Sequence, residues 1–184
     1  MRRAGLLLMA LGLVCLTAAG SLAVRNQAEE ARAGAAGTRA LAVMEKALST
    51  PDETEAMIGE QVWLGRLTIP SLELELPILS EWSYENLKTA PCHYCGSAGD
   101  GDLVLLAHNY RTHFGPIRRL KPGDPVIFED MAGTVYAYLV TAVEIVDADA
   151  LEDVTSGAHD LTLITCTYGG KKRVAVFCDA EKSS

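Results

Sequence analysis

A cysteine and an arginine are brought opposite each other by a short turn near the C-terminal end of the sequence. Cys166 ends the apolar, β-branched run 161–166, and Gly169 and Gly170 follow at the spacing of a two-residue hairpin loop. If these glycines form the loop, Cys166 pairs directly with Arg173 and both side chains point to one face. A permanent cation beside a thiol favours the thiolate and can stabilise an oxyanion. The spacing is that expected of a cysteine nucleophile with a cationic partner. The alternative is that Arg173 is an exposed charged residue on an edge strand, with no role in chemistry.

A cysteine enzyme also needs a proton donor for its leaving amine, and histidine usually fills that role. His108 directly follows the apolar run 103–107, so we expect it at the end of a strand. It is therefore the candidate acid. The other histidines fall in polar connections or between two cysteines, and we expect them to be structural or solvated: His93, His113 and His159.

Three further cysteines lie outside the apolar N-terminal segment, and thiols of exported proteins are usually oxidised. Cys92 and Cys95 enclose a His-Tyr pair, which leaves a disulfide, a metal half-site and two free thiols as interpretations. A single C-x-x-C without a second pair is weak support for zinc. Cys178 is left over and could pair with either of them.

An apolar segment at the N-terminus separates this chemistry from the cytoplasm. Residues 4–24 are uncharged and mostly apolar behind Arg2 and Arg3, and at about 1.5 Å per residue such a helix spans a ~30 Å hydrocarbon core. The positive-inside rule then exports the rest of the chain. A cleavable signal peptide is the alternative, because residues 21–23 form a small-x-small site. The length of the apolar run favours the first interpretation, in which residues 1–25 are a membrane anchor that is not cleaved.

The remaining chain divides into a linker and one domain. Residues 26–58 are rich in Ala, Glu and Arg and predict a helical stalk or linker, broken at Gly34 and Gly37. Residues 59–184 form the predicted domain, with short helical connections at 81–88, 113–120 and 149–155. Its strand-like segments, separated by Pro, Gly and Asp, are 62–69, 74–79, 102–107, 125–129, 134–146, 161–166 and 172–178. Seven or eight strands in about 125 residues predict a barrel or a sandwich.

Charge excludes one class of partner. The 184 residues carry a formal net charge of −8 and are 49% hydrophobic, which fits a packed domain and argues against a protein that coats nucleic acid by neutralising phosphates. We expect no nucleic-acid partner.

Taken together, these residues resemble the sortase family of cysteine transpeptidases. The likeness covers about residues 63–177, and the segment 162–166, Thr-Leu-Ile-Thr-Cys, matches the family motif TLxTC in full. The adjacent His108 and Asn109 lean toward the class B branch, and the seven-residue step from Cys166 to Arg173 predicts a short loop over the substrate groove. The matching features, in chain order, are His108-Asn109, 114–117, 120–124, 162–166 and Arg173.

The resemblance implies a mainly β fold, a closed eight-stranded sortase-type barrel with short helical connections behind an N-terminal transmembrane helix. It also implies that Cys166 attacks an LPxTG-like sorting signal of an exported protein and cleaves it between Thr and Gly. In that scheme His108 protonates the leaving amine and Arg173 holds the oxyanion or the substrate backbone. We expect the substrate groove to be lined by Asn109, Thr165 and Tyr168.

The partners follow from the same resemblance. An amine of the cell-wall peptide or of a pilin would resolve the acyl-enzyme, with hydrolysis as a side reaction, and no metal or cofactor is expected. The protein would lie in the cell membrane as a single-pass protein with its C-terminal domain outside. Two alternatives stay open: another extracellular cysteine peptidase or amidase, and a noncatalytic membrane-anchored module with its cysteines in disulfides.

Overall fold

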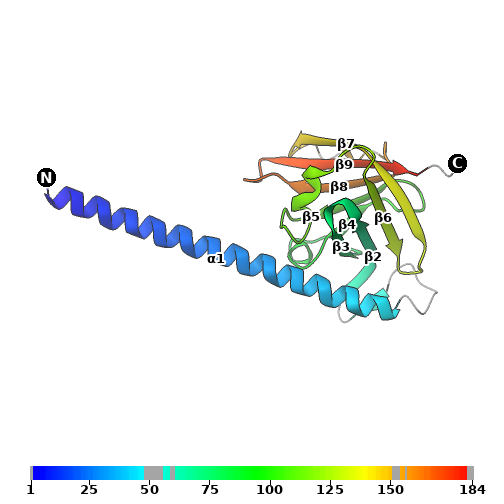
Figure 1. The fold of residues 1–184 in the computed structure, drawn as a ribbon, viewed down its shortest axis with the longest axis horizontal. Coiled ribbons are helices and arrows are strands. Elements are labelled where there is room, and N and C mark those ends of the chain that lie inside the picture. Colours follow the sequence, from blue (N-terminus) through cyan, green and yellow to red (C-terminus); the bar gives the residue numbers. More distant parts are fainter. Residues whose placement is uncertain (1, 48–55, 59–60, 151–153, 156, 182–184) are drawn as a thin grey trace.

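A long helix and a β-barrel make up the chain. The structure is a computed structural model that describes residues 2–47, 56–58, 61–150, 154–155 and 157–181. Helix α1 (Arg2–Ala47) projects from one side of the barrel, with the N-terminus at its far end (Figure 1). Its N-terminal part is long and apolar enough to cross a membrane. Residues 59–60, at the predicted start of the domain, and 151–153, within a predicted helical connection, lie outside the described residues.

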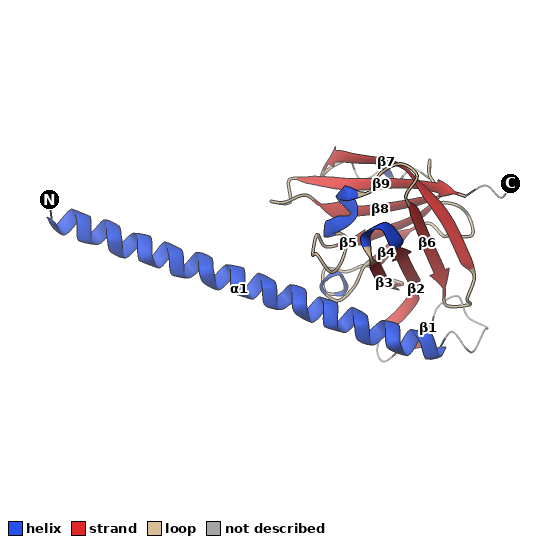
Figure 2. Cartoon of the chain, viewed as in Figure 1, coloured by secondary structure: helices blue, strands red, loops and turns tan. Residues whose placement is uncertain are grey.

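The barrel is one closed sheet, as predicted. Among the described residues, eight strands run in the order β2-β3-β4-β5-β8-β9-β7-β6, and β6 pairs back with β2 to close the ring, while β1 pairs with the first three residues of β2 (Figure 2). The β3–β4 and β5–β8 pairs are parallel and the others antiparallel. The strands are β1 (Ala56–Ile58), β2 (Gln61–Ile69), β3 (Leu74–Leu79), β4 (Cys92–Cys95), β5 (Leu103–Ala107), β6 (Pro125–Asp130), β7 (Val135–Asp147), β8 (Leu161–Cys166) and β9 (Lys172–Ala180).

Short connections and two short strands differ from the sequence prediction. Strand β1 lies within the segment 26–58, which was predicted as a helical stalk or linker. Two of the predicted helical connections contain single 3₁₀ turns, η2 (Asn86–Lys88) and η3 (Gly115–Arg119), and a third turn, η1 (Pro70–Leu72), follows β2. Strand β4 was not predicted, because its four residues are neither alternating nor rich in β-branched side chains. It exists through its pairing with β5, which includes a bulge between His93 and Cys95.

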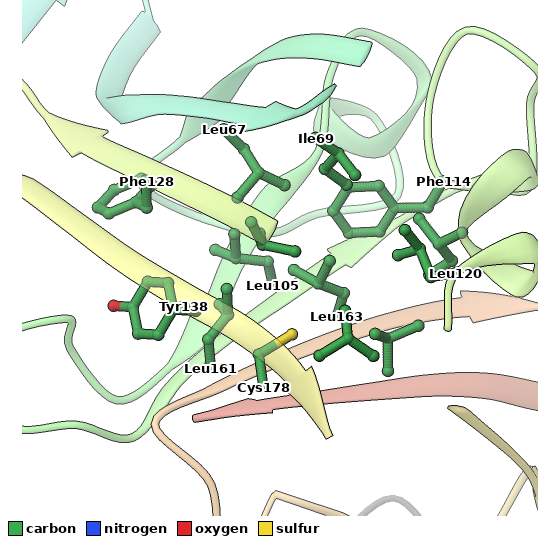
Figure 3. Close-up of a cluster of buried hydrophobic side chains, with 14 of the residues drawn as sticks. Leu67, Ile69, Leu105, Phe114, Leu120, Phe128, Tyr138, Leu161, Leu163 and Cys178 are labelled. Carbon is green, nitrogen blue, oxygen red and sulfur yellow. The ribbon is translucent and has the colours of Figure 1, made fainter. Parts of the chain in front are cut away.

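The barrel interior is filled by large apolar side chains from opposite walls. Phe128 on β6 faces Leu105 and Leu163 from the parallel pair β5–β8, and Phe114 packs into the same cluster (Figure 3). Phe114 belongs to the loop between β5 and η3 and is fully buried. The core therefore anchors the loop that begins at His108.

Helix α1 contradicts the predicted break at Gly34 and Gly37. It continues unbroken to Ala47, and both glycines lie where the helix approaches the barrel. A Cβ on Gly34 would lie 3.0 Å from Cγ2 of Thr112, and one on Gly37 would lie 3.7 Å from Cδ of Pro77. Further along, Met44 is buried in a second apolar cluster with Trp63. The glycines thus permit close packing, and the segment between the apolar run and the barrel is a docked helix.

Candidate active site

The hairpin that carries the cysteine has the predicted register. Cys166 on β8 pairs directly with Arg173 on β9. The loop is longer than predicted, because Thr167 and Lys172 close it with a hydrogen bond from the Thr167 amide to the Lys172 carbonyl, 2.9 Å. Both glycines have positive φ, +86° at Gly169 and +72° at Gly170. Lengthening the loop by one residue on each side leaves the Cys166–Arg173 pair unchanged.

The histidine reaches the same end of the barrel on the neighbouring strand. Strands β5 and β8 are parallel, and Ala107 pairs with Thr165. The next residues are His108, which directly follows β5, and Cys166, the last residue of β8, so both lie at the same end of the barrel. The buried hydroxyl of Thr165 donates to the carbonyl of Ala107 at 2.8 Å and fixes the two strand ends together. Three neighbouring strands, β5, β8 and β9, thus bring His108, Cys166 and Arg173 to one region.

A pocket opens at the cysteine. Its volume is about 280 Å³, and all three predicted groove residues line it. Thr165 contributes mainly to the wall, because its hydroxyl is used by the β5 carbonyl. The lining residues are Asn109, Gly115, Arg118, Ile145, Thr165, Cys166, Thr167, Tyr168 and Val174.

A second arginine, which the sequence analysis missed, lies in the wall of this pocket. The guanidinium carbon of Arg118 lies 4.8 Å from the ring centroid of Tyr168, a cation–π contact. Arg173, in contrast, donates from Nη1 to the carbonyls of Gly170 and Lys172 at 2.9 and 3.2 Å. Its guanidinium is therefore held by the hairpin loop. The only sequence signal for Arg118 is its place in the turn that follows the His108 loop.

The environment of His108 favours its neutral form. Burial lowers the pKa of His108, the positive charge of Lys88 lowers it further, and the negative charge of Glu29 on α1 opposes both. The ring lies 4.9 Å from that of Tyr110, which in turn lies 5.3 Å from the ring of His113. The proton that His108 would donate is thus less tightly held than in solution.

None of the four histidines is among the residues that line the Cys166 pocket, and neither is Arg173. His108 directly precedes the lining residue Asn109. His113 is buried rather than solvated, and burial lowers its pKa to about 4, so it is neutral at physiological pH. His93 contacts the carbonyls of Ser80 and Gly96 through its two ring nitrogens. His159 lies 2.9 Å from a carboxylate oxygen of Asp179.

All cysteines are free in the structure. The disulfide interpretation of Cys92 and Cys95 is not supported, since neither is bonded to another cysteine. Burial raises the pKa of Cys92 and of Cys178 to about 12, so both stay protonated and unreactive. Cys166 is a partly exposed thiol beside a pocket. Of the described residues, no three His, Cys, Asp or Glu side chains gather as a metal site.

Helix α1 holds the loop that follows His108. The Arg111 amide donates to Oε1 of Glu30 at 2.7 Å, and the Thr112 hydroxyl donates to the Glu30 carbonyl at 3.4 Å. Both contacts fall within four residues of His108. The helix that leads away from the apolar segment therefore supports one wall of the site.

Replacing Gly34 with valine tests this support. A Cβ at this position would lie 3.0 Å from Cγ2 of Thr112, which is tighter than an ordinary contact, and valine adds two methyl groups beyond it, so we expect the helix to shift off the loop. The expected cost is about 1–3 kcal/mol of unfolding free energy, with a several-fold fall in peptide turnover. Ala35→Val, at an exposed position of the same helix, is the matched control. Equal melting temperatures and equal turnover in the two variants would show that α1 does not support the loop.

Comparison with known proteins gives a consistent result. A family model described as the sortase domain matches residues 67–181. Sortase A of Bacillus anthracis is 34% identical over 128 residues, which are 65% of this chain and 60% of that protein. The chain spans between 53% and 60% of the length of this and two further curated sortase A relatives.

Solved structures show the same barrel. Sortase C-1 of Actinomyces oris superposes with a TM-score of 0.59 at 26% identity, covering 66% of this chain and 75% of the other. A Clostridium perfringens sortase C, solved with the C-terminal cell wall sorting motif, superposes with a TM-score of 0.58 at 28% identity, covering 66% and 71%.

Proposed function

Because the chain belongs to the sortase family, we propose that it is a cysteine transpeptidase that cleaves a C-terminal sorting signal and joins the acyl group to an amine at the cell surface. The observation that carries the proposal is the register of three adjacent strands. Cys166 and Arg173 are direct partners on β8 and β9, His108 directly follows the neighbouring strand β5, and a pocket opens at the thiol.

The first half-reaction uses Cys166 and His108. The sulfur of Cys166, as thiolate, attacks the carbonyl carbon of the signal's threonine, and the Thr–Gly bond breaks as His108 passes its proton to the departing glycine nitrogen. Arg173 or Arg118 stabilises the oxyanion that forms on the carbonyl. The product is a thioester on Cys166 and a free glycine amine.

The second half-reaction reverses these roles. An incoming amine attacks the thioester carbonyl, the new amide forms, and the Cys166 thiolate leaves while neutral His108 accepts the proton of the amine. Water in place of the amine gives hydrolysis. The substrate class, an LPxTG-like signal, is supported by the resemblance of the 162–166 segment and by the sorting motif bound to the C. perfringens relative.

The location follows from α1. Its apolar N-terminal part is a candidate anchor, and the barrel would then lie outside the membrane, where exported proteins present their signals. The class B leaning of the His108-Asn109 pair stays a prediction; the relatives described above are sortases A and C.

Incubating the full chain with LPxTG-like peptides, with and without an amine acceptor such as triglycine, tests the proposal. The expected products are an amine-exchanged peptide when the acceptor is present and slow hydrolysis when it is absent. Cleavage that ignores the acceptor would identify a peptidase, and no cleavage of any peptide would reject the proposed substrate class.

The pH profile tests the role of His108 as the acid. Only the imidazolium form can donate, and it is lost as pH rises through the lowered pKa of His108. Lys88→Gln removes a positive charge, so it should raise that pKa and move the falling limb of kcat/KM to higher pH. Glu29→Gln removes a negative charge and should move the limb to lower pH. If the falling limb of kcat/KM stays at the same pH in both variants, it does not arise from the titration of His108.

A further inference from the structure

A second, larger groove adjoins the Cys166 pocket and carries unpaired positive charge. It has a volume of about 790 Å³, lies between α1 and the barrel, and shares Gly115, Arg118 and Tyr168 with the cysteine pocket. Its other lining residues include Arg111 and Arg119. The two cavities thus meet at the Arg118–Tyr168 contact.

The three arginines have no ion-pair partner. Arg111, Arg118 and Arg119 are exposed and form no ion pair with any residue that the structure describes. Two carboxylates, those of Glu30 and Glu73, also line the groove, so the arginines outnumber the carboxylates there by three to two. In a chain with a net charge of −8, three unpaired cations in one groove indicate an anionic ligand.

The groove lies at the level where the apolar part of α1 ends. Gln27, which lines the groove, is three residues after Val24, the last residue of the uncharged run. That distance is about 4.5 Å along a helix, less than the thickness of the headgroup layer. The connected ends of β8 and β9 also point toward the N-terminal half of α1 (Figure 1). If α1 spans the membrane, the arginines face its surface.

We propose that this arginine-lined groove docks the catalytic domain onto the headgroups of anionic phospholipids. The three guanidinium groups would bind lipid phosphates, against the repulsion that the acidic remainder of the domain would otherwise experience. Because the groove joins the Cys166 pocket, docking places the mouth of the active site at the membrane surface. The proposal rests on α1 being the anchor, and it requires no step of the transpeptidation.

Arginine labelling of the full chain in lipid nanodiscs tests this directly. Phenylglyoxal modifies accessible guanidinium groups, and mass spectrometry of the digested protein gives a rate for each arginine. The discs contain phosphatidylcholine alone or an equimolar mixture with phosphatidylglycerol. Arg39 is the internal reference, because it is exposed on the same helix about 22 Å beyond Val24, well outside a Debye length of about 8–10 Å.

We expect Arg111 and Arg119 to react about fivefold more slowly than in neutral discs, relative to Arg39, only when the anionic lipid is present. About 1 M salt should remove the difference. Arg119→Gln should weaken the protection of Arg111 and Arg39→Gln should not, where protection is taken as the ratio of the Arg111 rates in the two kinds of disc. Equal rates in both discs, protection in neutral discs as well, or equal effects of the two substitutions would each overturn the proposal. Since the readout involves no peptide, its failure would leave the proposed transpeptidase function untouched.

Discussion

Cys166→Ala is expected to abolish both the thioester adduct and the transpeptidation product. No other thiol among the described residues lines the pocket, and its hydroxyl groups are far weaker nucleophiles, so turnover should fall by at least about 10³-fold. Folding should change little, since Cys166 is a partly exposed residue at the end of its strand. Product formation from a sorting peptide and an amine, followed by chromatography, measures the loss.

The matched control is Cys95→Ala. This residue is another partly buried free thiol, on β4 and outside the pocket lining. It should retain nearly full turnover. Substantial activity in Cys166→Ala, or an equal loss in the two variants, would contradict the assignment of the nucleophile.

Arg173→Ala is expected to have the next largest effect, a loss of about 10²–10³-fold in kcat with a stable fold. The cation that pairs with Cys166 is removed, and so are the bonds from its Nη1 to the hairpin loop. Arg173→Lys keeps the charge but loses the planar fork, so its activity separates charge from geometry.

Arg118→Ala decides which cation acts on the oxyanion. Arg118 lines the Cys166 pocket, whereas the Arg173 guanidinium is bonded to the loop. If Arg173 stabilises the transition state, its removal should lower kcat more than the removal of Arg118 does. The reverse order, measured in the same peptide assay, would assign the oxyanion to Arg118 and leave Arg173 as a support of the hairpin.

Local sequence rules were sufficient to predict the pairing in the hairpin that carries Cys166. The run of residues 161–166, two glycines and an equal count on each side set Cys166 opposite Arg173, and the structure has that register. The same rules predicted too short a loop, because the hydrogen bond that closes it joins Thr167 and Lys172 rather than the residues next to the two glycines. A symmetric change in loop length does not alter which residues pair. The pairing of Cys166 with Arg173 was therefore predictable even though the length of the turn was not.

Local sequence rules could not predict pairing between strands that are far apart in the chain. Closure of the barrel depends on β2 meeting β6, more than fifty residues later in the chain, and only the family resemblance implied it. Strand β4 has no pattern of its own and exists because β5 lies beside it. Barrel closure and short strands such as β4 depend on contacts between segments that are distant in sequence. The secondary-structure propensity of a single segment therefore does not predict them.

The docked helix shows the same limit. A glycine within a helical pattern can break the helix or allow a close approach, and its neighbours in sequence do not distinguish the two. Gly34 lies against Thr112 and Gly37 against Pro77, so both glycines allow a close approach, and both contacts come from segments distant in sequence. Arg118 was missed for a related reason, since only the fold brings it over Tyr168.

The central claim, that Cys166 forms an acyl-enzyme with a sorting signal, is tested most directly by intact-mass analysis of the full chain after brief exposure to an LPxTG-like peptide. We expect an added mass equal to the peptide up to its threonine, mapped by fragmentation to Cys166 and discharged when an amine is added. An adduct on another of the five cysteines, or an unmodified chain while the peptide is consumed, would contradict it.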